Sequence, residues 1–404
     1  MNNWFLLAAI PVFGICVLVH EFGHFITAKW AGIRVEEFGL GFPPRLVGFR
    51  KRDSGGWEVI WFGGKRDAED GASDLGLQSP FSGTSGGITN AETAKHHTIY
   101  SINFLPIGGF VRMPGENGDI NDENGKYDPG SFAAKTAGKR IIVLVAGVTM
   151  NVILAMVLFT IAYSLGEPTY PPAIGQVVAG SPAAHAGFKP GDSIVSVNGQ
   201  PVQQFTDLQN DVTNAISADK SSSPIVPITM VVRRAGQSST FATTVNVRKN
   251  PPSGQGPMGV VEKVVFVSSP FWQAPFKGFV HTFSVTGDFI NQIGMMVAGA
   301  VKPQLAGPVG IVKITGEVAS TVPDLGWWPI LSLTAILSLN LAIINILPFP
   351  ALDGGRVLLI LIELLRGGKR LKPEREGIIN FIGMAILLTL MVVITVSDVI
   401  HWGG

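Results

Sequence analysis

Four apolar segments constrain most strongly what this chain can fold into. They cover residues 4–30, 141–165, 328–348 and 378–400. A helix needs about 20 mainly apolar residues to cross the hydrocarbon core of a bilayer, and each of these segments reaches that length. Only 15% of the residues are charged, whereas soluble domains carry about 25%. The sequence therefore predicts a polytopic α-helical membrane protein with about four transmembrane helices.

Bulk composition excludes several other classes. A net charge of +1 gives no reason to suspect a nucleic-acid partner, and none is expected. The single cysteine, Cys16, excludes an intrachain disulfide and a cysteine-based zinc site. No Lys or Arg precedes the first apolar segment and no small-residue cleavage site follows it. We therefore expect a retained transmembrane helix there, and not a cleaved signal peptide.

The distribution of Lys and Arg predicts the orientation. These residues flank the apolar segments on one side only: Lys29, Arg34, Lys135, Lys139, Arg140, Arg366, Lys369, Arg370, Lys372 and Arg375. Residues 1–3 and 401–404 carry none. Because loops rich in Lys and Arg stay cytoplasmic, we expect 31–139 and 349–377 inside. Both termini and the segment 166–327 are then extracytoplasmic.

The first apolar segment contains an unusual polar cluster, His20-Glu21-Phe22-Gly23-His24, which matches the pattern H-E-x-x-H. Residues four apart share one face of a helix, so both imidazoles can bind one metal ion. Glu21 is then placed to act as general base on a metal-bound water. A chance match or a structural role is the alternative. Burying such groups at membrane depth is costly unless something compensates, which favours a zinc site with one open position for water.

Asp353 is the predicted third ligand. It follows Pro348 and Pro350, and neither proline can continue a helix. Irregular backbone at membrane depth is tolerated only where it is buried in protein or lines a cavity. Gly354 and Gly355 would let the chain pack closely or take positive φ. The alternative is a turn at the membrane edge with Asp353 as a helix cap, but the predicted topology places Asp353 at the depth of the two histidines.

Together these motifs resemble a known family. HEFGH in the first apolar segment and NILPFPALDGG at 345–355 resemble the site-2 proteases, the intramembrane zinc metalloproteases of peptidase M50 type, and within them the bacterial branch related to the regulator of sigma-E protease. Further similar stretches are FLPIGGFVRMPGE at 104–116, AGVTMN at 146–151 and GPVGIVKITGE at 307–317. Val148 stands where the family often has proline, a departure that bears on the role of Asn151 and not on the metal site.

The resemblance implies a function. It implies a Zn²⁺ ion held by His20, His24 and Asp353, with Glu21 as the base. Asn345 would help to hold the substrate backbone or the developing oxyanion; the alternative is an amide that packs helices by hydrogen bonding. The expected reaction is hydrolysis of peptide bonds within transmembrane segments, near the cytoplasmic side of a prokaryotic plasma membrane. Pre-trimmed anti-sigma factors and remnant signal peptides are the expected substrates.

Two other classes of function remain open. One is a catalytically inactive membrane scaffold that binds partners through its outer domain, and the intact Glu21 argues against it. The other is a metal transporter that uses intramembrane His and Asp as an ion path. Transporters of that kind are often built from inverted repeats, which are not apparent here.

A strand pattern occurs in the predicted cytoplasmic loop. Apolar residues flank the two glycines of 101–116, which predicts two short strands around a glycine turn. The resemblance implies a membrane-associated β-hairpin that reaches toward the active site, where its edge could pair with an unwound substrate. Its candidate substrate-binding residues are Gly108, Gly109, Phe110, Val111 and Arg112. An ordinary surface hairpin is the alternative, and 70–98, rich in Gly, Ser and Thr, is expected to be a flexible insertion.

The outer segment has the composition of a soluble domain. Residues 177–202, VVAGSPAAHAGFKPGDSIVSVNGQPV, resemble part of a PDZ domain, and Asn198-Gly199 predicts a hairpin turn. Such a domain can bind a peptide along its edge or only restrict access to the membrane part. Residues 275–301 mix apolar side chains with Lys, His, Asp and Asn, which predicts an amphipathic helix on the outer membrane surface.

The predicted organisation follows the chain. It comprises a first transmembrane helix at 1–31, a cytoplasmic loop at 32–139, a second transmembrane helix at 140–166, one PDZ domain at 170–250, an amphipathic helix and linker at 270–327, a third transmembrane helix at 328–355, a cytoplasmic loop at 356–377 and a fourth transmembrane helix at 378–401.

Overall fold

A computed structural model describes residues 3–52, 55–61, 97–116, 128–301 and 306–400. Of the predicted insertion, residues 70–96 lie outside the described part. The chain divides into two compact units: Met1–Tyr163 together with Pro270–Gly404, and Ser164–Ser269.

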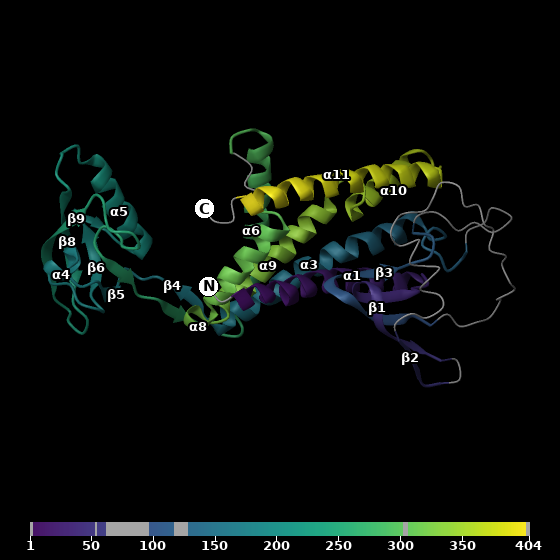
Figure 1. Cartoon of the computed structure of the whole chain (residues 1–404), viewed down its shortest axis with the longest axis horizontal. Coiled ribbons are helices and arrows are strands. Elements are labelled where there is room, and N and C mark those ends of the chain that lie inside the picture. Colours follow the sequence, from purple (N-terminus) through teal and green to yellow (C-terminus); the bar gives the residue numbers. More distant parts are fainter. Residues whose placement is uncertain (1–2, 53–54, 62–96, 117–127, 302–305, 401–404) are drawn as a thin grey trace. The chain divides into compact units, whose positions relative to one another are not determined.

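The first unit contains four described helices that are long and apolar enough to cross a membrane (Figure 1). They are α1 at Ala9–Ala31, preceded by the 3-10 helix η1 at Asn3–Ala8, α3 at Ala137–Leu165, α9 at Trp328–Ile346 and α11 at Pro373–Ile400. This confirms the prediction of a membrane protein with helices at these four places.

The third predicted helix, 328–355, is wrong at its C-terminal end, as is the predicted loop 356–377. Helix α9 ends at Ile346, and a new helix, α10, runs over Asp353–Leu365. Two prolines between them cannot continue the helical hydrogen bonding. Both glycines of the motif pack against the intervening bend: a Cβ atom at Gly354 would clash with the Ile346 carbonyl, and one at Gly355 with the Phe349 carbonyl.

A sheet is formed by β1 at Glu37–Lys51, β2 at Trp57–Trp61 and β3 at Ile99–Arg112, in the order β2-β1-β3. Both long strands bend back on themselves. Residues 37–40 of β1 pair with 99–102 on one side and with 109–112 on the other. The predicted hairpin in 101–116 is therefore wrong in its pairing, because the start of β1 lies between the two halves of β3. Gly108, with φ +93°, does lie at the bend.

One face of this sheet is apolar. Cross-strand partners point to the same face, and the residues on this face are Trp57, Val59, Trp61, Val47, Phe49, Tyr100, Ile102, Phe38, Leu40, Gly109 and Val111, with Lys51 at the margin. At one end α1 covers this face, where the Phe25 ring lies 5.0 Å from that of Phe38 and 6.0 Å from that of Tyr100. At the other end Trp57 and Trp61 remain 61% and 69% exposed. The opposite face is mixed: it carries Glu37, Arg50, Glu58, Ser101 and Arg112 beside Ile60, Ile99 and Phe110.

Three further helices are described in this unit: α6 at Ala274–Val297, α7 at Pro308–Ser320 and α8 at Val322–Leu325. A helix was expected at the position of α6. The predicted linker up to 327 is wrong, because α7 and α8 occupy much of it, and Pro308 lies in the first turn of α7, where proline is well tolerated.

The second unit is a small α+β domain. Its sheet has the order β7-β6-β8-β9, formed by Gln200–Pro201, Ser193–Val197, Ile225–Arg233 and Thr240–Arg248. Two helices accompany it, α4 at Pro182–His185 and α5 at Phe205–Ala218. Short strands β5 at Ile174–Val177 and β10 at Val260–Glu262 pair, as do β4 at Glu167–Thr169 and β11 at Val265–Val267.

The interior of this domain is built from alternating strand residues. Every second residue of β8 is buried, and the fully buried members of the core include Ile228, Met230 and Val232. The predicted hairpin turn is confirmed: Asn198 and Gly199 have φ of 47° and 82° and join β6 to β7.

Candidate metal centre

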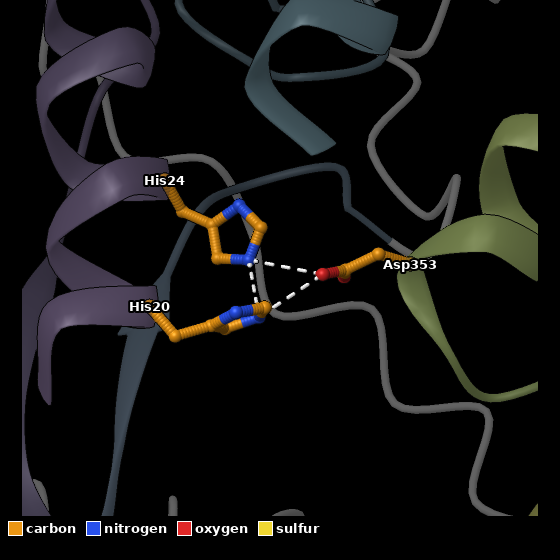
Figure 2. A group of neighbouring side chains, drawn as sticks. All are labelled: His20, His24 and Asp353. Atoms are coloured by element: carbon orange, nitrogen blue, oxygen red, sulfur yellow. Dashed lines mark hydrogen bonds and ion pairs between the residues drawn. The ribbon is translucent and has the colours of Figure 1, made fainter. Parts of the chain in front are cut away.

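Two helices bring three potential ligands together (Figure 2). His20 and His24 lie one turn apart on α1, and Asp353 is the first residue of α10. The Nε2 atoms of His20 and His24 are 3.1 Å apart, and they lie 3.1 and 3.3 Å from the Asp353 Oδ2 atom. Asp353 is not a helix cap, because the N-cap of α10 is Leu352 and no side-chain cap bond is present there.

A backbone carbonyl determines which nitrogen of His24 carries the proton. The Nδ1 atom lies 2.8 Å from the carbonyl oxygen of Val143 on α3. A carbonyl can only accept a hydrogen bond, so Nδ1 is the protonated nitrogen. Nε2 of His24 therefore presents its lone pair toward His20 and Asp353.

Asn151 on α3 plays the corresponding part for His20. Its amide lies 3.3 Å from the His20 Nδ1 atom, and its Oδ1 atom is buried without a hydrogen-bond partner. Amide oxygen and nitrogen occupy nearly equivalent positions. With Oδ1 turned toward His20, that oxygen accepts the Nδ1–H proton and is satisfied. The Ser338 hydroxyl donates to the Asn151 carbonyl at 2.9 Å and anchors this residue to α9.

The resulting donor set fits zinc. Two imidazole lone pairs and one carboxylate oxygen converge within 3.1 to 3.3 Å, and three acceptors repel one another unless a cation lies between them. In a tetrahedral site with zinc–ligand bonds of about 2.0–2.1 Å, ligand atoms lie about 3.3 Å apart. With three protein ligands, one tetrahedral position stays open for water or substrate.

Glycines allow the helices to approach at this point. A Cβ atom at Gly147 would lie 2.5 Å from the His24 Nε2 atom, and one at Gly23 would lie 2.5 Å from the Ala146 carbonyl oxygen. α1 and α3 can therefore pack with the imidazoles against the α3 backbone. A larger residue at 147 would occupy the space that the imidazoles need.

Glu21 and Asn345 face the same cavity, which has a volume of about 280 Å³. It is lined by Val17, His20, Glu21, His24, Val111, Met113, Glu116, Leu144, Leu341, Asn345, Ala351, Leu352, Asp353 and Arg356. The Asn345 Nδ2 atom lies 3.5 Å from the His20 Nε2 atom. The Glu21 carboxylate accepts the backbone N–H of Val111. The residues predicted as base and as oxyanion group thus lie beside the candidate ligands.

The predicted substrate-binding residues divide between the two faces of the sheet. Val111 lines the cavity, and a Cβ atom at Gly109 would lie 3.4 Å from the Glu21 Cγ atom. Phe110 and Arg112 point to the opposite face, because side chains alternate along a strand. The Arg112 guanidinium lies 6.0 Å from the Phe110 ring centre. Neither residue is among those that line the cavity.

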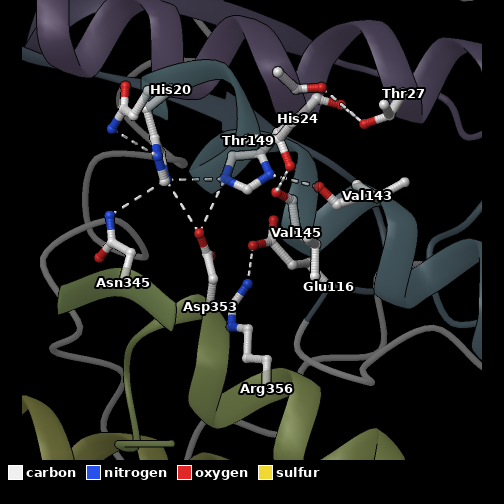
Figure 3. Close-up of polar contacts among 12 residues, drawn as sticks. His20, His24, Thr27, Glu116, Val143, Val145, Thr149, Asn345, Asp353 and Arg356 are labelled. Atoms are coloured by element: carbon white, nitrogen blue, oxygen red, sulfur yellow. Dashed lines mark hydrogen bonds and ion pairs between the residues drawn. The ribbon is translucent and has the colours of Figure 1, made fainter. Parts of the chain in front are cut away.

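Glu116 and Arg356 are cavity residues that sequence reasoning missed. They form an ion pair between the segment after β3 and the first turn of α10 (Figure 3). The nearby Glu116 carboxylate raises the pKa of the Arg356 guanidinium, which therefore stays charged. They lie 240 positions apart, so no local spacing could reveal the pair.

Known proteins resemble this chain over nearly its whole length. The model of peptidase family M50 matches residues 8–73 and 85–390. The Enterococcus faecalis protein named "Probable protease eep" is 32% identical over 430 residues, covering 98% of each chain. Zinc metalloprotease RasP of Geobacillus kaustophilus is 28% identical over 472 residues, covering 98% of this chain and 97% of its own. Regulator of sigma-W protease RasP of Bacillus subtilis is 28% identical over 471 residues, covering 98% of each.

Proposed function

The chain belongs to peptidase family M50, and from this premise we propose that His20, His24 and Asp353 hold the zinc ion with which it hydrolyses peptide bonds inside the membrane. The protein is a zinc metalloprotease, and its described residues include four helices able to span a bilayer. The observation that carries the assignment of ligands is the convergence of three acceptor atoms within 3.3 Å of one another.

Each residue around the site has a separate role in the reaction. Bound zinc supplies Lewis-acid polarisation and acidifies water. Glu21 takes a proton from the attacking water and returns it to the amide nitrogen as the C–N bond breaks. Asn345 donates a hydrogen bond to the carbonyl oxygen as negative charge develops on it. Val143 and Asn151 hold both imidazoles in the tautomer that leaves Nε2 free.

We propose that the substrate is a transmembrane segment that binds as a strand. A helix shields its own peptide bonds, so it must unwind before a nucleophile reaches a carbonyl carbon. Residues 109–112 form the edge of the sheet next to Glu21, where an unwound segment can add by main-chain hydrogen bonding. Membrane-anchored anti-sigma factors and remnant signal peptides fit this requirement. The name of the Bacillus subtilis relative, a regulator of sigma-W protease, supports the first.

The topology proposed from the sequence is consistent with this site. The distribution of Lys and Arg supports a multi-pass protein of the prokaryotic plasma membrane. In this topology both termini and the Ser164–Ser269 unit lie outside, and the active site lies near the cytoplasm. We assign this unit as a PDZ domain on its four-stranded sheet with two helices. It binds a peptide along its edge or restricts access to the site.

The apolar sheet face supports membrane association of the cytoplasmic sheet. It joins α1 at Phe25, and its far end exposes Trp57 and Trp61. Exposed apolar patches of this extent mark a protein or membrane contact, and tryptophan favours the membrane interface. We propose that this face lies in the cytoplasmic leaflet.

Cleavage of a single-span substrate by purified protein tests the function. Wild-type protein is expected to cut within the span, whereas Glu21→Gln keeps its zinc and does not cut. Cleavage by Glu21→Gln at the wild-type rate would remove Glu21 as the base. A wild-type protein that neither binds zinc nor cuts would support the catalytically inactive scaffold.

A further inference from the structure

The ion pair between Glu116 and Arg356 lies at the edge of the metal cavity, and both residues line it. Arg356 is three residues after Asp353, in the first turn of α10. Side chains of a helix point toward its N-terminus, and residues three apart are neighbours that form ion pairs. The Arg356 guanidinium is therefore placed where it could also reach the Asp353 carboxylate.

In the structure the guanidinium is engaged elsewhere. Arg356 pairs with Glu116, while the Asp353 Oδ2 atom faces His20 and His24 (Figure 3). Glu116 and Arg356 have side-chain exposures of 25% and 24%, so the pair is largely screened from solvent. Three carboxylates raise the pKa of the Arg356 guanidinium, those of Glu116, Asp353 and Glu376, and Glu116 has the largest influence.

An arginine bound to Asp353 would compete with zinc. A guanidinium binds a carboxylate through two parallel hydrogen bonds, which would occupy the oxygen lone pairs that a metal ligand needs. A carboxylate that holds the arginine away keeps Asp353 available.

We propose that Glu116 is a positioning residue that holds the Arg356 guanidinium away from Asp353 and so keeps this carboxylate free to bind zinc. The pair also links the segment after β3 to α10, the helix that begins with Asp353. Val111 of β3 itself binds Glu21. This inference rests on the proposed role of Asp353 as a ligand.

Zinc affinity of the full-length purified protein, measured by competition with a chromophoric chelator, tests it. Glu116→Gln is expected to weaken zinc binding about tenfold or more, because Arg356 turns to Asp353. The double variant Glu116→Gln/Arg356→Gln is expected to recover the wild-type affinity. A merely structural role would leave the double variant as weak as Glu116→Gln or weaker. That result, or wild-type affinity in Glu116→Gln, would overturn the proposal.

Two controls separate this inference from its premise. Glu363→Gln breaks another carboxylate–arginine contact of α10, with Arg140, and is expected to leave zinc affinity unchanged; an equal loss there would mean that any broken pair on α10 weakens the site. Asp353→Asn is expected to lose zinc. If it keeps zinc with wild-type affinity, Asp353 is not a ligand. That result contradicts the proposed metal site itself, independently of the role of Glu116.

Discussion

Gly147 on α3 lies directly against His24 on α1, so that a Cβ atom at position 147 would come within 2.5 Å of the His24 Nε2 atom. The same Cβ would lie 2.8 Å from the His20 Cε1 atom. The candidate metal centre thus involves three helices: α1 carries two candidate ligands, α10 carries the third, and both imidazoles lie against α3. A change on α3 is expected to act on zinc although α3 contributes no ligand.

Gly147→Ala is expected to weaken zinc binding at least tenfold, in the range known for changes around metal ligands. The added methyl group displaces both imidazoles. Gly138→Ala is the matched control on the same helix, because a Cβ atom there has nothing within 4 Å. Zinc titration of both variants measures the effect. Equal affinities in the two proteins would show that α3 does not shape the site.

Asn151→Ala is expected to weaken zinc binding by about 10-fold to 100-fold, since it removes the acceptor for the His20 Nδ1 proton. Asn151→Asp keeps an acceptor at that place and is expected to bind zinc more tightly than the alanine variant. The comparison uses the same competition assay. An alanine variant with wild-type affinity would mean that His20 needs no partner for its second nitrogen.

The apolar sheet face is expected to contact lipid. In a Cys16→Ala background, a fluorophore at Val59→Cys should show blue-shifted emission in vesicles and should be quenched by brominated lipid. Glu58→Cys is the control, because the two positions point to opposite faces of β2. It should respond mainly to a water-soluble quencher. Identical quenching at both positions would contradict a lipid-facing surface.

Zinc removal is expected to destabilise the packing of α1, α3 and α10, because three acceptor atoms then face one another without a cation. Free zinc at 1,000 times its dissociation constant stabilises a folded protein by about 4 kcal/mol. Thermal unfolding in detergent should therefore shift to lower temperature on chelation and recover when zinc is added back. Asp353→Asn, already deprived of the site, should not respond to the chelator. A chelator effect of equal size in both proteins would place the relevant metal elsewhere.

The candidate site could be predicted from the sequence for two reasons. Its motifs are local in the chain, and polar groups at membrane depth are costly unless they have a function. Spacing on one helix face places His20 beside His24, and two prolines mark the break before Asp353. Helix α10 was missed because the Lys and Arg residues at 366–375 predicted a cytoplasmic loop, whereas the largely apolar residues before them form a helix. The pairing of β3 was missed because residues 37–40 come from a distant segment. Neither Asn151 nor the Glu116–Arg356 pair follows from local spacing, since each depends on contacts formed only by the fold.

The most direct test of the account is the zinc content of three purified proteins: wild type, Asp353→Asn and Glu21→Gln. If His20, His24 and Asp353 are the ligands and Glu21 is the base, wild type and Glu21→Gln each hold one equivalent of zinc. Asp353→Asn should then hold far less. Full zinc occupancy in Asp353→Asn, or loss of zinc in a folded Glu21→Gln protein, would contradict this assignment of roles.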